Sequence, residues 1–309
     1  MLNCPMDILH KFPVRKTKAQ KEAFRSAVQE YAKSIGYECR VERRNLSCQN
    51  VLFGDPEKAS YLVTAHYDTC TRLPFPNFIM PCNGAVFVLC RIGKWLLIAL
   101  IAVVVSVFSA LLLGEWGLIP AAVLSVAATV LLALIGPANK QNANDNTSGV
   151  VTLLEIMRTM SENQREKVCF VLFDQEEAGL IGSSFYRSCH RRASETQLVL
   201  NLDCVGDGDH IRMFPTNKLK KDRKRLTSLY KACGYFGKKD VLVHEKGFGV
   251  YPSDQLRFPY GVGICALKKC KFGLYLGKIH TSKDMVLDET NVNILRAALT
   301  SFICCDEVN

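Results

Sequence analysis

The chain has 309 residues, 49% of them hydrophobic, and a formal net charge of +10 at pH 7. This length and apolar content allow one large buried core or two modest ones. The 14 cysteines form no compact disulfide framework and the N-terminus holds no apolar signal region, which argues against a secreted, disulfide-stabilised protein. We expect mostly reduced thiols in a cytosolic compartment.

The N-terminal part alternates between helical and strand-like segments. Residues 16–35 have the apolar spacing of a helix that Gly36 ends. Strand-like segments follow at residues 37–42, 47–53 and 60–65.

Two long uncharged segments come next. Residues 95–113 and 118–135 contain 19 and 18 residues without a charge, close to the roughly 20 residues that cross a bilayer core. Only "GEWG", residues 114–117, separates them, and Trp95 and Trp116 suit the membrane interfaces. We predict a transmembrane helical hairpin inserted at residues 91–137. The alternative is a pair of buried core helices, although segments that are apolar on all sides fit lipid at least as well.

After the hairpin, helical and strand-like segments alternate again to the end of the chain. They are a helix at 147–160, a strand at 167–173, a helix at 180–189, a strand at 198–202, mixed signals at 218–276 and a helix at 291–304. Such alternation predicts an α/β fold with helices on both faces of a central sheet. Residues 1–90 and 138–309 would then form one domain around the hairpin.

A strongly basic segment, "KLKKDRKR", lies at residues 218–225 and contains six basic residues. A solvated helix face is the commonest meaning of such a segment. A surface near anionic lipid is the second possibility. We do not expect nucleic-acid binding, because no basic motif with interleaved aromatic residues accompanies it.

Three acidic residues follow an apolar strand in "VCFVLFDQEEAGLIGSS", residues 168–184. Asp174, Glu176 and Glu177 lie within four positions, at the strand end where open α/β sheets bind ligands. They form either a solvated acidic loop or a site where a cation binds or a carboxyl holds a proton.

Further candidates are His66 and Asp68 in "VTAHYDT", Asp145 before a helix, Asp203 at a strand end and His280 in "GKIHTSKD". Separately, Asp145 could be a helix-initiating residue and His280 an ordinary loop histidine. With Glu177, however, the two histidines and three carboxylates form a nitrogen and oxygen ligand set that suits zinc. Five ligands exceed one tetrahedral site, which favours two metals sharing a carboxylate.

In the order and spacing of these motifs, the chain resembles the co-catalytic zinc aminopeptidases, which share a fold with glutaminyl cyclases and glutamate carboxypeptidase. The resemblance covers residues of about 8–82 and 138–305. It implies a mixed central sheet in a zinc peptidase catalytic domain, interrupted by the hairpin.

The resemblance also implies a role for each site residue. His66 and Asp203 correspond to ligands of one zinc, Glu177 and His280 to ligands of the other, and Asp145 to the bridging ligand. Asp68 corresponds to the acid that orients the ligand histidine, and Glu176 to the general base. Asp174 is expected at the surface or in a cap. The segment "YPSDQLRF" departs from the family, because Gln255 stands where a histidine is usual, which puts substrate contacts in doubt.

We therefore expect a membrane-tethered aminopeptidase with two zinc ions, acting on peptides. One alternative is a glutaminyl cyclase with one zinc, and another is a non-catalytic membrane scaffold of the same fold. Arg91, Lys94 and Lys140 flank the hairpin, whereas the short turn has no basic residue and one acid, Glu115. This bias predicts that the catalytic domain lies on the cytoplasmic side of the bilayer.

Overall fold

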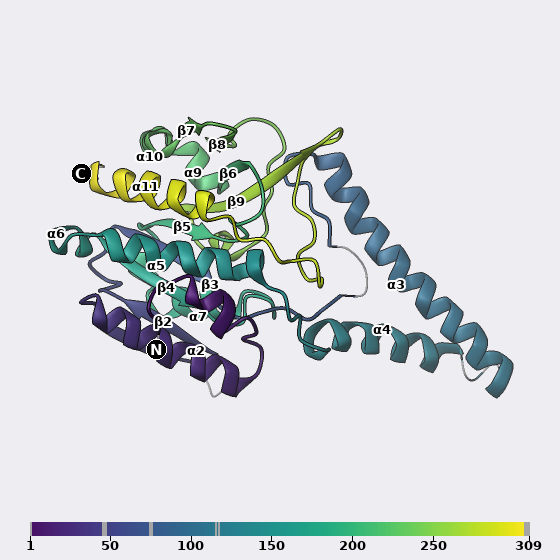
Figure 1. Cartoon of the computed structure of the whole chain (residues 1–309). Helices are drawn as coiled ribbons and strands as arrows, with labels where there is room; N and C mark the ends of the chain where they lie inside the picture. The colour runs from purple at the N-terminus through teal and green to yellow at the C-terminus, as the bar shows by residue number, and fades with distance from the viewer. Residues whose placement is uncertain (1, 45–47, 74–76, 115, 117, 306–309) are drawn as a thin grey trace.

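The computed structural model of the chain describes residues 2–44, 48–73, 77–114, 116 and 118–305 (Figure 1). Its described residues form one sheet of ten strands: β1 Cys39–Arg43, β2 Gln49–Phe53, β3 Tyr61–His66, β4 Val168–Phe173, β5 Leu198–Leu202, β6 His210–Pro215, β7 Gly234–Phe236, β8 Lys239–Val243, β9 Gly261–Cys270 and β10 Gly273–Tyr275.

The sheet is mixed, as the resemblance implies. Its order is β1-β2-β4-β3-β5-β9-β6-β8-β7, and β10 pairs with β9. Strands β4, β3, β5 and β9 are parallel to one another. Antiparallel strands adjoin this centre, with β2 beside β4 and β6 beside β9.

The helices are α1 Asp7–Lys11, α2 Lys18–Ser34, α3 Gly84–Leu113, α4 Leu118–Ile135, α5 Gly149–Thr159, α6 Glu162–Arg165, α7 Ile181–Cys189, α8 Arg191–Ser194, α9 Asn217–Lys221, α10 Arg223–Leu229 and α11 Glu289–Cys305. Helix α2 begins where Thr17 and Gln20 form a capping box, which satisfies backbone N–H groups of its first turn.

Successive residues of a strand point to opposite faces of the sheet. Apolar residues on both faces pack against helices, and so helices cover both faces. On one face, Val63, Phe170 and Leu200 pack in the main core with residues of α2, α5 and α11. On the other face, Leu62, Val171 and Val199 pack in a smaller core with Tyr186 of α7. The predicted fold class is confirmed.

The first hairpin helix is longer than the sequence analysis predicted. It begins at Gly84 rather than near residue 95, because Asn83 caps it by accepting a hydrogen bond from the Val86 N–H. Arg91 and Lys94 lie before the uncharged segment, so the sequence analysis did not include them in it. Both residues favour helix formation, and the helix includes them. At its base, the rings of Phe87 and Phe248 lie 5.5 Å apart, and so the helix contacts the domain that contains the sheet there.

The two hairpin helices project away from the sheet and pack against each other (Figure 1). Within the part of the chain that the structure describes, one helix, residues 84–112, is long and apolar enough to cross a membrane, with a mean hydropathy of 2.8 and only 11% of its most apolar window buried. The described apolar part of the second, Leu118–Thr129, is shorter. A pair of buried core helices is not what the structure shows. Residues 115 and 117 of the predicted turn lie outside the described residues, and the domain boundaries stay a prediction.

The basic segment 218–225 spans α9 and α10, at the end of the molecule away from the hairpin (Figure 1). Leu219 is buried, whereas the cationic groups of Lys218 and Arg225 lie 4.9 and 4.1 Å from the Tyr260 ring centre. This arrangement matches a solvated helix face with one buried anchor.

Candidate metal centre

The parallel register brings several acidic and imidazole side chains to one edge of the sheet. His66, the last residue of β3, pairs with Phe173, the last residue of β4. Strand β5 lies on the other side of β3 and ends at Leu202, directly before Asp203. Three neighbouring strands therefore end at the same edge of the sheet.

Asp145 reaches this edge from an irregular segment, Ala143–Ser148, that precedes α5. Hydrogen bonds hold the segment on both sides of Asp145. The Asp284 carboxylate accepts the N–H groups of Asn144 and Asp145 at 2.8 and 3.0 Å, and the Asn146 side chain donates to the Leu202 carbonyl at 2.9 Å.

The five predicted zinc ligands and Glu176 line one cleft of about 180 Å³. Its other lining residues are Asn77, Ile79, Cys204, Tyr251, Pro252 and Ile279. Asp68 lies behind the cleft and is buried.

Within the cleft, the ligand atoms form two groups that meet at Asp145. His66 Nε2 lies 3.4 Å from Asp145 Oδ1 and 3.7 Å from Asp203 Oδ1. His280 Nε2 lies 3.0 Å from the other Asp145 oxygen, Oδ2, and 3.5 Å from Glu177 Oε2. The two oxygens of one carboxylate thus face different histidines.

Asp68 contacts both His66 and the turn that carries Glu176 and Glu177. Its two carboxylate oxygens accept the backbone N–H groups of Glu176 and Glu177 at 3.0 and 3.2 Å. The same carboxylate lies 3.6 Å from His66 Nδ1, and the Asp68 carbonyl oxygen is nearer, at 3.2 Å. Asp68 therefore fixes the backbone that presents both glutamates.

The carboxyl groups are crowded in a poorly solvated place. Burial, followed by the charge of neighbouring Glu177, raises the pKa of Glu176 well above its ordinary range. Burial and the charge of Asp145 do the same for the pKa of Glu177. Removing carboxylates from water disfavours their charged form unless a cation or a proton compensates.

The donor set fits zinc. Imidazole nitrogens and carboxylate oxygens are ligands that zinc accepts. Glu177 Oε1 is a buried acceptor with no hydrogen-bond partner among the described residues, as expected of an atom that binds an ion. His66, Asp145 and Asp203 form one group of atoms within 4.8 Å of each other, and Cys70, Glu177 and His280 form another.

Sequence reasoning missed three residues of this neighbourhood. Cys70 is buried beside Glu177 and His280, and its thiol contacts the Asn142 oxygen at 3.5 Å. Asp284 positions Asp145, and burial raises its pKa to about 8. Burial also raises the pKa of Asp254 to about 7. Asp284 lies four residues after His280, and Asp254 directly precedes Gln255, so both are in segments that the sequence analysis quoted. The sequence did not indicate that they are buried.

One expectation about an individual residue needs correction, and Gln255 lies outside the metal cleft, as the sequence analysis placed it outside the metal ligands. Asp174 is not at the surface: it is fully buried and lies 2.5 Å from Lys21 Nζ of α2. Gln255 is also buried, and its amide donates to the Tyr251 carbonyl and accepts from Asn201, so it does not line the cleft.

Comparisons with known proteins agree with this picture. The profile of peptidase family M28 matches residues 126–300. None of the curated proteins matches the chain.

Solved structures of low sequence identity share the fold. The glutaminyl cyclase of Porphyromonas gingivalis has a TM-score of 0.59 and 14% identity, over 95% of this chain and 93% of that one. A Zn-dependent exopeptidase from Parabacteroides distasonis has a TM-score of 0.58 and 15% identity, over 96% and 94%. A glutaminyl cyclase of Fimbriiglobus ruber gives 0.60 and 15%, over 98% and 94%.

Proposed function

The chain belongs to peptidase family M28, which supports a zinc-dependent metallopeptidase, and we propose more narrowly that it is a membrane-tethered aminopeptidase with two zinc ions. The observation that carries the proposal is the position of Asp145. Its two oxygens lie 3.4 and 3.0 Å from the Nε2 atoms of His66 and His280. A carboxylate between two imidazole groups suits a shared ligand of two metal ions.

In this proposal, His66 and Asp203 would hold one zinc ion, Glu177 and His280 would hold the other, and Asp145 would be the ligand that the two share. Zinc ions bound there would supply a Lewis acid for the scissile carbonyl and for a water molecule. The remaining chemistry belongs to side chains of the chain. Glu176 lines the same cleft beside the proposed ligands, where a carboxylate can accept a proton from a water molecule.

Glu176 acts as the general base. As the water oxygen bonds to the carbonyl carbon, the Glu176 carboxylate takes a proton from that water. When the carbon–nitrogen bond breaks, the same carboxyl gives the proton to the leaving amine. Asp68 accepts the backbone N–H of Glu176 and so helps to position this side chain in the cleft.

Metal analysis combined with an aminoacyl-amide panel tests the function. The purified, detergent-solubilised chain should contain about two zinc ions and release N-terminal residues. Asp145→Asn should lose both properties, because the substitution replaces one shared oxygen with an amide nitrogen that cannot bind zinc. The matched control is Asp209→Asn at an exposed acid that pairs with Lys239.

The alternatives give different results in the same experiment. One zinc per chain together with cyclisation of N-terminal glutamine would support a glutaminyl cyclase. If Asp145→Asn keeps both its metal and its activity, Asp145 is not a shared ligand. A folded chain that binds no metal would support a non-catalytic scaffold.

The hairpin supplies the proposed membrane tether. Helix α3 has 30 residues, and its apolar side chains, such as Leu111 at 79% exposure, face away from the protein core. We propose that α3 and α4 lie in the bilayer, with the catalytic domain on the cytoplasmic side and peptides as substrates. Nucleic acid is not a proposed partner.

A further inference from the structure

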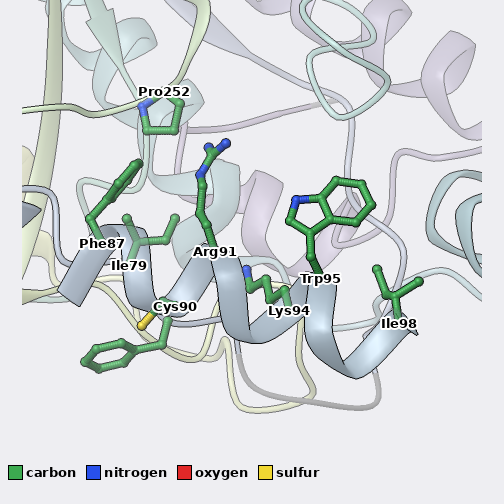
Figure 2. Close-up of a pocket in the computed structure, with 9 residues that line it drawn as sticks. Ile79, Phe87, Cys90, Arg91, Lys94, Trp95, Ile98 and Pro252 are labelled. Carbon is green, nitrogen blue, oxygen red and sulfur yellow. The ribbon is translucent and has the colours of Figure 1, made fainter. Parts of the chain in front are cut away.

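A second cavity, of about 260 Å³, lies where helix α3 leaves the catalytic domain (Figure 2). One wall comes from the domain, through Phe78, Ile79 and Pro252. Ile79 and Pro252 also line the metal cleft, so the two spaces adjoin.

The other wall is one face of α3. Its residues follow the spacing of a helical stripe and are Phe87, Cys90, Arg91, Lys94, Trp95 and Ile98. Figure 2 shows Arg91 and Trp95 projecting from successive turns on the side of the helix that faces Pro252. The cavity is therefore apolar except for two adjacent cations.

The two cations have no acidic partner among the residues that the structure describes. The Arg91 guanidinium lies 5.1 Å from the Phe87 ring centre, and the Lys94 ammonium donates a hydrogen bond to Asn77 Oδ1. Neither forms a salt bridge with a described carboxylate, although the chain pairs many of its other basic residues. Both charges can therefore bind an anion.

The length of α3 indicates where this cavity would lie relative to the bilayer. About 20 residues cross the hydrocarbon core at a rise of about 1.5 Å each. Counted back from the end of α3 at Leu113, those residues reach Lys94. Arg91, Lys94 and Trp95 then lie at the level of the lipid headgroups, where basic and aromatic side chains are favoured.

We propose that this cavity binds the headgroup of an anionic phospholipid at the mouth of the metal cleft, an inference that rests on the proposed membrane tether. The phosphate lies between Arg91 and Lys94, and the glycerol and upper acyl carbons contact Trp95 and Ile98. Because the lipid touches both α3 and the Ile79–Pro252 wall, it holds the helix against the domain beside the cleft.

Tryptophan quenching in reconstituted lipid vesicles tests the proposal on the full chain. The chain has two tryptophans, so Trp116→Phe leaves Trp95 in the cavity as the single emitter. Two lipid mixtures carry the same fraction of acyl-brominated lipid. In one, phosphatidylglycerol is brominated and phosphatidylcholine is plain, and in the other the label is reversed.

We expect stronger quenching when phosphatidylglycerol carries the bromine, with an enrichment around Trp95 of roughly fivefold per basic group. Arg91→Gln with Lys94→Gln should abolish the difference between the mixtures. The matched control, Lys220→Gln with Lys221→Gln on α9, removes the same charge far from the hairpin and should keep it.

Other results would overturn the proposal in distinguishable ways. Equal quenching by both mixtures in the Trp116→Phe protein would show a membrane helix without headgroup binding. No quenching by either mixture would remove the membrane tether as well. If a dipeptide with a free carboxylate changes Trp95 emission in detergent, and the Arg91/Lys94 double variant loses that change, the cavity belongs to the peptide substrate instead.

Discussion

At the scale of single residues, the site depends on side chains that hold other side chains. Asp145 can face two histidines because Asp284 and Asn146 fix the backbone around it. Glu176 and Glu177 diverge from one turn because Asp68 accepts both of their N–H groups. Such supporting contacts keep a site in its productive geometry before any ligand arrives.

Glu176→Gln tests the proposed base directly. The amide keeps the size of the side chain but cannot accept the proton, so kcat should fall by about 10²–10⁴-fold. Zinc content should stay unchanged, because Glu176 is not one of the proposed ligands. The matched control is Glu195→Gln, at a half-exposed glutamate that pairs with Arg187. Turnover close to that of the unmodified enzyme would exclude Glu176 as the base.

Asp284→Asn tests whether Asp284 positions the shared ligand. An asparagine side chain has one acceptor oxygen instead of two, so one of the two backbone N–H groups of Asn144 and Asp145 loses its partner. We expect zinc affinity to fall by about 10–100-fold, the usual effect of removing a group that orients a metal ligand. Competition with a chelator measures this affinity without relying on activity.

The control for that measurement is Asp222→Asn, which alters the acidic cap of α10 far from the cleft. If Asp284→Asn binds zinc as tightly as this control, the hydrogen bonds to segment 143–148 do not determine the position of Asp145.

At the scale of elements, the sequence predicted the segments that carry the site better than the contacts between them. Apolar strands followed by acids indicated β4 and β5 and the edge at which they end. The pattern did not show that Asp174 is buried against Lys21 of α2. The sequence of an acid after a strand is the same whether its side chain is solvated or buried. Strand β6 was also missed, since its polar residues His210 and Arg212 interrupt the apolar pattern.

The Lys21–Asp174 ion pair connects α2 to the end of β4, and its side chains are only 10% and 0% exposed. Lys21→Met should lower the free energy of unfolding by about 3–5 kcal/mol, because it leaves a buried carboxylate unpaired. Chemical unfolding of the detergent-solubilised protein, followed by circular dichroism, measures the loss. Lys33→Met on the exposed side of the same helix is the control, and equal stability of the two variants would contradict the argument.

At the scale of the whole molecule, the hairpin enters the domain between two proposed zinc ligands, His66 and Asp145. Its base also forms a wall of the cavity beside the metal cleft. The sequence predicted an apolar insertion but not this contact, because Phe87 and Phe248 are distant in the chain and nothing in their local patterns pairs them. The insertion is thus part of the surroundings of the site.

The last prediction concerns the side of the membrane on which the catalytic domain lies. In the proposed topology both ends of the hairpin lie in one compartment, and the basic residues Arg91, Lys94 and Lys140 lie near those ends. Because basic residues near helix ends favour the cytoplasmic side, the domain should be cytoplasmic and residue 116 should be outside. Trp116→Cys should therefore react with an impermeant thiol reagent on intact cells that carry the protein at their surface. The exposed native cysteines, Cys4 and Cys189, should react only after detergent is added. Labelling of these two before detergent, with protection of residue 116, would instead place the metal cleft outside the cytoplasm.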